Sequence, residues 1–240
     1  MVEHVILARH GHAENNRRGI VSADPRVPYP LTELGREQAT TLGRTIADDP
    51  IQLCVASEFA RTQETVDIAL AGRDVPRLIL AEFNDVRADG FEGQDFSEMQ
   101  RWLLANGPAT IPPGGGERRI DSVRRVCLGF RCILGRHEEV VLVVDHVLSV
   151  IVGRARPGKE DAVVTLGDVP AGHAECHRLS AKDLRRSVLV MERWVERVNR
   201  RARGAGGVVG GDSGRLGLMA NRLASETSPY GAPNDVPRQV

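Results

Sequence analysis

The stretch Val5-Ile6-Leu7-Ala8-Arg9-His10-Gly11 decides the fold class of this chain of 240 residues. Four apolar residues, 5–8, follow one another without a polar interruption, which is typical of a strand buried on both faces of a sheet. The run ends at Arg9 and His10, and Gly11 then allows the backbone to approach closely. Ligands of open α/β sheets bind at the carboxyl ends of strands. The stretch therefore predicts either an anion site with a nucleophile or base, or a plain strand end with a surface arginine and histidine.

Composition allows one sizeable domain and excludes several classes of partner. Hydrophobic residues make up 41% of the chain, and Lys+Arg 32 balance Asp+Glu 32, so no excess charge favours nucleic acid or an anionic membrane. No apolar stretch approaches the length of a membrane span. The four cysteines form no Cys-x-x-Cys pair, and the first residues lack the basic and apolar regions of a leader. We therefore expect a reducing, cytoplasmic location.

Strands and helices alternate along the chain. The apolar runs predict strands at 5–8, 51–56, 77–80, 140–144 and 174–179. Helices are expected at 32–48, 57–71, 96–104, 117–136, 147–153 and 181–198; in the first of these Thr32 is the N-cap, and Leu34, Gln38, Leu42 and Ile46 recur at helical spacing. This alternation predicts an α/β fold, a three-layer α/β/α sandwich with a mostly parallel central sheet.

The character of the chain changes near residue 200. Residues 204–217 are rich in glycine, and the end of the chain is rich in Ser, Pro and Asn. We therefore expect one domain at 1–200 and a Gly-rich, disordered C-terminal tail at 201–240.

Basic side chains follow several of the predicted strands. Two strands end in a histidine, His10 and His146, and Arg61 lies in the first turn of a helix that follows a third strand. Together with Arg9 these side chains converge on one edge of the sheet, where helix N-termini add backbone N–H donors. Guanidinium forks and imidazoles suit a tetrahedral dianion such as phosphate, and sulfate fits equally well on charge.

Five motifs, in order and with their spacing, resemble the histidine phosphatase superfamily, the group that includes the phosphoglycerate mutases. Arg9-His10-Gly11 is followed by Asn16. Residues 30–39 match the family pattern Pro-Leu-Thr-x-x-Gly-x-x-Gln-Ala, and residues 57–65 match Ser-x-x-x-Arg-Thr-x-x-Thr. Gly116-Glu117 resembles the Gly-Glu that opens a late helix, and His146 follows the last core strand.

The resemblance implies a set of roles for these residues. His10 resembles the nucleophile that becomes a phosphohistidine, and it must be neutral to attack phosphorus. Arg9, Arg61 and His146 resemble the clamp on the phosphate oxygens. The family mechanism implies neither a metal nor another cofactor.

Further roles concern hydrogen bonds and the proton donor. Asn16 and the backbone N–H of Val147 are expected to bind the phosphate. Glu82 follows the third strand, where the family has its proton donor to the leaving oxygen, and we favour it by position over the competing residues of the acidic loop. Those competitors are Asp85, Asp89 and Glu92.

The chain also departs from the family pattern. Asp145-His146-Val147-Leu148 stands where the family commonly has Ser-His-Gly-Gly, and Asp145 is expected to orient an imidazole or to raise its pKa. The loop between Glu82 and residues 92–93 is longer than usual. His173, Cys176 and His177 suggest a metal site, but on a strand Cys176 faces away from both histidines, so we reject that interpretation.

The favoured function is a phosphatase that hydrolyses a phosphorylated small molecule. Mutases exclude water, usually with long lid insertions, whereas here the core ends near residue 200 and the loop after Glu82 is modest. Two alternatives stay open: phosphoglycerate mutase-type phosphoryl transfer, and a catalytically weak phospho-ligand-binding protein. The outer wall of the pocket is expected from 15–29, 84–101 and 154–172. The sequence does not indicate the oligomeric state.

Overall fold

The computed structural model describes residues 1–160 and 172–205. Most of the irregular stretch predicted at 154–172, and nearly all of the tail predicted at 201–240, therefore lie outside the described residues.

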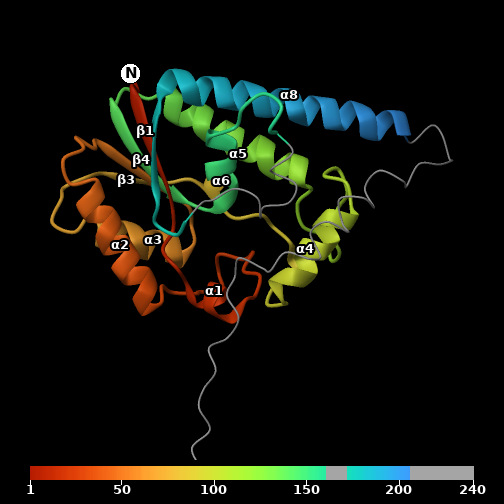
Figure 1. Ribbon diagram of the computed structural model, residues 1–240, viewed down its shortest axis with the longest axis horizontal. Helices are drawn as coiled ribbons and strands as arrows, with labels where there is room; N and C mark the ends of the chain where they lie inside the picture. Colours follow the sequence, from red (N-terminus) through yellow and green to blue (C-terminus); the bar gives the residue numbers. More distant parts are fainter. Residues whose placement is uncertain (161–171, 206–240) are drawn as a thin grey trace, which may run out of the picture. The chain divides into compact units, whose positions relative to one another are not determined.

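A five-stranded sheet forms the centre of the described chain (Figure 1). Its strands lie in the order β3-β2-β4-β1-β5, and only β5 is antiparallel to its neighbour among the pairs that the structure describes. The mostly parallel sheet expected from the sequence is confirmed. The strands are β1 (His4–Arg9), β2 (Leu53–Ala56), β3 (Arg77–Ile79), β4 (Val140–Asp145) and β5 (Cys176–Ser180).

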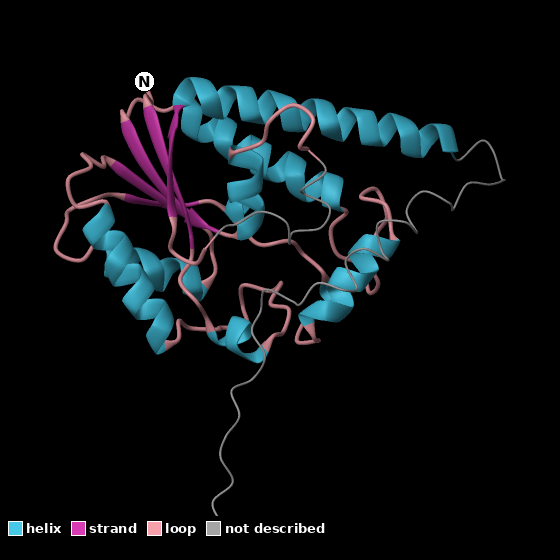
Figure 2. Cartoon of the chain, in the orientation of Figure 1, coloured by secondary structure: helices cyan, strands magenta, loops and turns pink. Residues whose placement is uncertain are grey.

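Helices follow most strands, as Figure 2 shows by colour. The α-helices are α1 (Glu14–Arg18), α2 (Glu33–Thr45), α3 (Ala60–Ala69), α4 (Phe96–Ala105), α5 (Arg119–Leu134), α6 (Val147–Gly153) and α8 (Ala181–Ala205). Two short 3₁₀ turns, η1 (Ala81–Phe83) and η2 (Asp89–Phe91), lie between β3 and α4.

The two faces of the sheet pack on different helices. Alternate residues of one strand point to opposite faces, so Val5 and Leu7 contact one core and Ile6 and Ala8 the other. The first core contains side chains of α5, α6 and α8, and the second contains side chains of α2 and α3, on the other side of the sheet in Figure 1. This arrangement confirms the three-layer sandwich.

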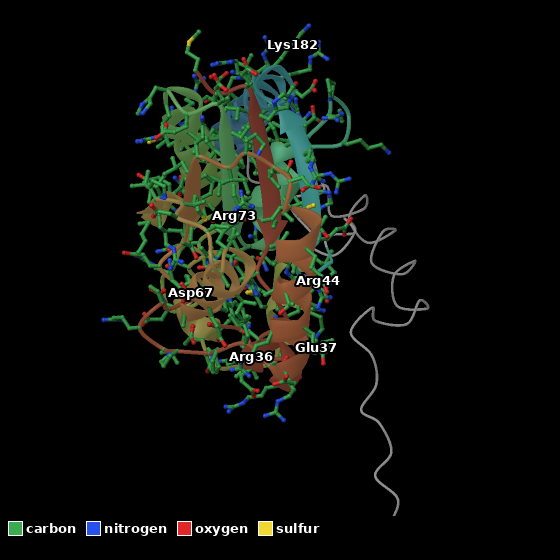
Figure 3. All side chains as sticks on the ribbon, turned by 90° about the vertical axis from the view of Figure 1, so that its left-hand side faces the viewer. Arg36, Glu37, Arg44, Asp67, Arg73 and Lys182 are labelled. Atoms are coloured by element: carbon green, nitrogen blue, oxygen red, sulfur yellow. The ribbon has the colours of Figure 1, made fainter. Side chains whose placement is uncertain are left out.

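Helix α2 packs partly through the predicted stripe, because Leu42 and Ile46 are buried as expected. Thr32 caps it as expected, because its side chain accepts a hydrogen bond from the backbone N–H of Gly35. Leu34, however, is 52% exposed, and the buried residues of the helix are Gly35, Ala39 and Leu42. The small residues allow a close approach that the spacing of large apolar side chains did not indicate. The polar face of α2 carries Arg36, Glu37 and Arg44 (Figure 3).

The last helix is longer than predicted. Helix α8 continues to Ala205, beyond both the expected end at 198 and the domain boundary placed at residue 200. Residues 196–203 lack apolar periodicity but consist mostly of good helix formers, and cations are favoured at a helix C-terminus.

Candidate active site

The ends of β1 and β4 bring two histidines together. Arg9 pairs with Asp145 in the parallel register, and the backbone N–H of His10 donates to the Asp145 carbonyl over 2.9 Å. The next residue of each strand end is a histidine, so the His10 and His146 rings meet edge to face with centroids 5.2 Å apart. The end of β1 that the sequence pattern predicted therefore lies in a cluster of ionisable groups, together with the end of β4.

His10 is held as a neutral imidazole. Its Nδ1 lies 2.7 Å from the carbonyl oxygen of Gly11, which only accepts, so Nδ1 carries the hydrogen. Nε2 then has the lone pair, and the Nε–H of Arg61 donates to it over 3.3 Å. Burial, followed by the positive charge of Arg61, holds the pKa of His10 well below its ordinary value, and Arg9 acts in the same direction. A neutral imidazole with an unprotonated Nε2 is the form that can act as a nucleophile.

Arg61 is the buried cation at the centre of the site. It is the second residue of α3 and only 1% exposed. Its guanidinium donates to the hydroxyl of Ser22 over 3.0 Å and to the carboxylate of Asp85 over 3.0 Å. It also lies over the Phe59 ring, with Cζ 4.2 Å from the ring centroid. These contacts fix the guanidinium beside His10.

His146 lies between a hydroxyl and a carboxylate. Its Nε2 is 3.0 Å from the hydroxyl of Ser57, and its Nδ1 is 3.3 Å from Oδ2 of Asp85. Burial lowers the pKa of His146 to about 3, against the opposing effect of Asp85 and together with the charge of Arg61. The second histidine is therefore also neutral at neutral pH.

The carboxylate in the site belongs to Asp85, not to Glu82. Burial would raise the pKa of Asp85, but His146 and Arg61 outweigh it, so the pKa is below its ordinary value. Glu82 lies in η1, with its Cβ against Gly129 of α5, and its carboxylate makes no hydrogen bond or ion pair with the residues that the structure describes. The 3₁₀ turn after β3 moves the first acidic residue aside and brings the next one, three positions later, onto Arg61.

The other two acidic candidates have different partners. Asp89 pairs with the exposed Arg87 at 3.2 Å. Glu92 accepts hydrogen bonds from the backbone N–H groups of Ala23 and Asp24. Glu92 therefore fixes the loop that contains Ser22, whose hydroxyl accepts a hydrogen bond from Arg61.

A second arginine fastens the segment that carries Asp85. Arg125 of α5 donates to the backbone carbonyls of Ala81, Glu82, Asn84 and Asp85 at 2.8–3.3 Å. Both oxygens of Glu117 hold this guanidinium in turn, at 2.8 and 2.9 Å. The Gly-Glu motif thus positions Asp85 through Arg125.

The remaining predicted residues are Arg9, Asn16 and Val147. Arg9 is half-buried, and its charge lowers the pKa values of His10 and His146, so it acts on the same site. The side-chain oxygen of Asn16 accepts from the backbone N–H of Ala13 over 3.0 Å and starts α1, a helix that the sequence did not predict. Val147 is the first residue of α6, and its side chain packs on the first core.

Gly11 is required because two motifs touch there. A Cβ on Gly11 would lie 2.5 Å from the carbonyl oxygen of Gly35, and a Cβ on Gly35 would meet the backbone of His12. The backbone N–H of Gly11 also donates to the hydroxyl of Thr65 over 3.0 Å. Two stretches that are distant in sequence, 30–39 and 57–65, therefore fix the residue after His10.

A third histidine, His173, lies against the nucleophile. Its Nδ1 is 3.1 Å from the carbonyl oxygen of His10, and the two rings are 5.4 Å apart. Burial lowers the pKa of His173 to about 3. The sequence drew attention to this residue only as a metal ligand, although the antiparallel pairing of β5 with β1 puts the start of β5 at the end of β1. Within the described ranges, no group of three or more His, Cys, Asp or Glu is arranged to hold a metal.

The burial of Asp145 argues against one of its two expected roles, raising the pKa of an imidazole. Its carboxyl group is fully buried, and burial raises its pKa well above the ordinary value. That shift favours the uncharged acid, a form that does not raise the pKa of a neighbouring imidazole.

No described helix is long and apolar enough to span a membrane.

Residues 5–158 match the model of the histidine phosphatase superfamily (branch 1). An adenosylcobalamin/alpha-ribazole phosphatase of Salmonella typhi is 40% identical over 160 residues, which cover 62% of this chain and 77% of that protein. A protein of the same name from Salmonella typhimurium is 41% identical over 80 residues, and there the match spans only 39% of the relative.

The crystal structure of the alpha-ribazole phosphatase from Shigella flexneri has a similar fold. Its TM-score is 0.61 at 23% identity, and the alignment covers 73% of this chain and 89% of that chain. The chain therefore belongs to the histidine phosphatase superfamily, and the enzyme class expected from the sequence, a histidine phosphatase, is confirmed.

Proposed function

We propose that this enzyme hydrolyses the phosphomonoester of a small molecule through a covalent phosphohistidine on His10. The observation that carries the proposal is the state of His10. Its Nδ1–H is fixed on the Gly11 carbonyl, and its Nε2 lone pair lies beside Arg61 in a buried, cationic pocket. That combination suits attack on a phosphorus atom whose oxygens carry negative charge.

The phosphate group would bind among Arg9, Arg61 and His146, with Asn16 and the backbone N–H of Val147 as further donors. Nε2 of His10 forms a bond to phosphorus, and the bond between phosphorus and the ester oxygen breaks. The leaving oxygen takes a proton from a carboxylic acid. Water then attacks the phosphohistidine, returns a proton to that acid and releases inorganic phosphate.

Asp85 is the proton donor in this proposal, in place of Glu82. Its Oδ2 is 3.0 Å from Arg61 and 3.3 Å from His146, the two groups that would bind phosphate. An arriving dianion competes for both partners and repels the carboxylate, so the proton affinity of Asp85 increases when substrate binds. The low pKa in the free enzyme is therefore compatible with acid catalysis in the complex.

The test is a rapid-quench experiment with a ³²P-labelled phosphomonoester. We expect a label on His10 that is stable to alkali and lost in acid, followed by release of phosphate, and His10→Ala should abolish both. A panel of small phosphoesters that includes α-ribazole 5′-phosphate, named for relatives of this chain, would define the substrate. An active enzyme without a labelled histidine would refute the mechanism.

The same assay separates the two alternatives. With phosphoglycerate, interconversion of isomers without phosphate release would identify a mutase. Phosphate binding without turnover of any ester would identify a catalytically weak phospho-ligand-binding protein.

A further inference from the structure

Arg119 is a buried cation without a hydrogen-bond acceptor. It is the first residue of α5 and only 4% exposed, and none of its three guanidinium nitrogens finds an acceptor among the described residues. Burial lowers the pKa of Arg119 to about 10, so the side chain is still charged at neutral pH. Charged groups removed from water are normally paired, as the equally buried Arg61 is. Arg119 therefore resembles one half of an ion pair.

The guanidinium lines a small pocket with apolar walls. Phe91, Met99, Trp102 and Leu103 form much of its wall, and its volume is about 20 Å³. A single water needs about 10–15 Å³, so the free space beside the guanidinium is that of one to two waters, close to the two oxygen atoms of a carboxylate and too small for a ring. The N-terminus of α5, a helix of 16 residues, adds its positive dipole end at the same place.

The pocket adjoins the proposed acid. Val86 and Arg87, the two residues after Asp85, belong to its lining. Asp85 and Glu117 are the nearby negative charges that act on Arg119, but Asp85 contacts Arg61 and His146, and both oxygens of Glu117 bind Arg125. Neither carboxylate is available as the partner of Arg119.

We propose that this pocket binds a carboxylate on an apolar stem, carried by the leaving group of the substrate. The proposal rests on the proposed function: an acid at Asp85 protonates the leaving oxygen, so the leaving group must lie on the Asp85 side of the site, where the pocket is. The planar fork of Arg119 matches a carboxylate. A second phosphate fits less well. Its charge exceeds that of one guanidinium, and its volume exceeds the space of about 20 Å³.

Two matched esters test the substrate class. Butyl phosphate and 4-(phosphonooxy)butanoate differ by a terminal carboxylate. We expect the wild-type enzyme to prefer the carboxylate ester at least about tenfold in kcat/KM, and Arg119→Leu to reduce this ratio to about one. Arg119→Lys should retain part of the preference. Arg124→Leu is the control, since Arg124 lies on the same helix but is exposed and paired with Asp121 at 2.7 Å.

A binding measurement is independent of turnover. Trp102 lines the pocket, so butanoate should change its fluorescence in the wild-type protein and in Arg124→Leu but not in Arg119→Leu. Trp102→Phe, which keeps Trp194, identifies the origin of the signal.

The outcomes separate the two proposals. Hydrolysis of both esters without a carboxylate preference, or a preference that survives Arg119→Leu, overturns the pocket proposal and leaves the phosphatase intact. Failure to hydrolyse either ester or to form a phosphoenzyme overturns the proposed function. In that case the butanoate titration alone decides whether Arg119 binds a carboxylate.

Discussion

Replacing Asp85 by asparagine should separate catalysis from phosphate binding. The substitution keeps the shape of the side chain but removes both the charge and the transferable proton. If Asp85 is the proton donor, hydrolysis of an alkyl ester such as butyl phosphate should slow by about 10²- to 10⁴-fold, the usual contribution of a general acid. Hydrolysis of 4-nitrophenyl phosphate should change much less, because a nitrophenolate leaves without a proton.

Phosphate affinity should move in the opposite direction. In the free enzyme Oδ2 of Asp85 accepts a hydrogen bond from Arg61 at 3.0 Å and lies 3.3 Å from His146. A hydrogen bond between charged groups contributes about 1.5–3 kcal/mol, and the Asp85 side chain is 28% exposed, so the lower end applies. Phosphate must displace this contact, and about 1.4 kcal/mol corresponds to a factor of ten. Competitive inhibition by inorganic phosphate should therefore be about tenfold tighter in Asp85→Asn.

Steady-state kinetics with the two esters, and phosphate as inhibitor, measure both effects in one preparation. Glu82→Gln is the matched control, because the carboxylate of Glu82 makes no contact with the described site, and it should leave both rates unchanged. An equal loss of rate on both esters in Asp85→Asn, or weaker phosphate inhibition, would refute the assignment. A selective loss with the alkyl ester in Glu82→Gln would restore the first candidate.

Other perturbations should have these effects. Arg119→Leu should raise the melting temperature by an amount equivalent to about 1 kcal/mol or more, because it replaces a buried charge with no acceptor among the described residues by an apolar side chain; a lower melting temperature would contradict this. Gly11→Ala should lower the free energy of unfolding by about 1–3 kcal/mol, as measured in urea, because its Cβ would meet the Gly35 carbonyl. Stability should fall with acid: the pKa values of His146 and His173 are about 3 in the folded protein and near 6.5 when unfolded, so the unfolded chain binds more protons in this window. Each histidine then contributes a loss of up to about 1.4 kcal/mol per pH unit below about 6.5, and His173→Gln should reduce the slope by about one proton; a slope equal to that of the wild type would refute the assignment.

The sequence predicted the sheet and the strand ends for a physical reason. A strand buried on both faces appears as an unbroken apolar run, so the position where each run stops is visible in residues 5–8 and 140–144. Parallel neighbours end at the same edge, and the structure accordingly brings His10 and His146 together. Arg61 follows from the same argument, because a helix that begins after a strand starts at that edge.

The ends of apolar runs do not show which acidic residue is the candidate proton donor. Four acidic candidates follow β3, and which of them lies in the site depends on one 3₁₀ turn and on the hydrogen bonds of Arg125 to the segment. His173 was missed for a related reason. Its position depends on the antiparallel pairing of β5 with β1, a long-range contact that leaves no local pattern. The pocket of Arg119 is likewise defined only by packing, of residues 86–91, α4, residues 106–112 and the start of α5.

Phosphate binding should exchange one negative group for another at Arg61: the phosphate replaces the carboxylate of Asp85. In the free enzyme the Asp85 carboxylate neutralises part of the positive charge of Arg61, and three neutral histidines surround the pair. A phosphate dianion that enters this pocket takes over the same donors, so substrate binding and protonation of Asp85 favour each other. Linkage requires the converse as well: protonating Asp85 must tighten phosphate binding. Inorganic phosphate should thus bind more tightly as the pH falls toward the pKa of Asp85 in the complex, and Asp85→Asn should abolish that pH dependence while keeping the tight binding. If the variant retains the same pH dependence, another group carries the proton and Asp85 only positions Arg61.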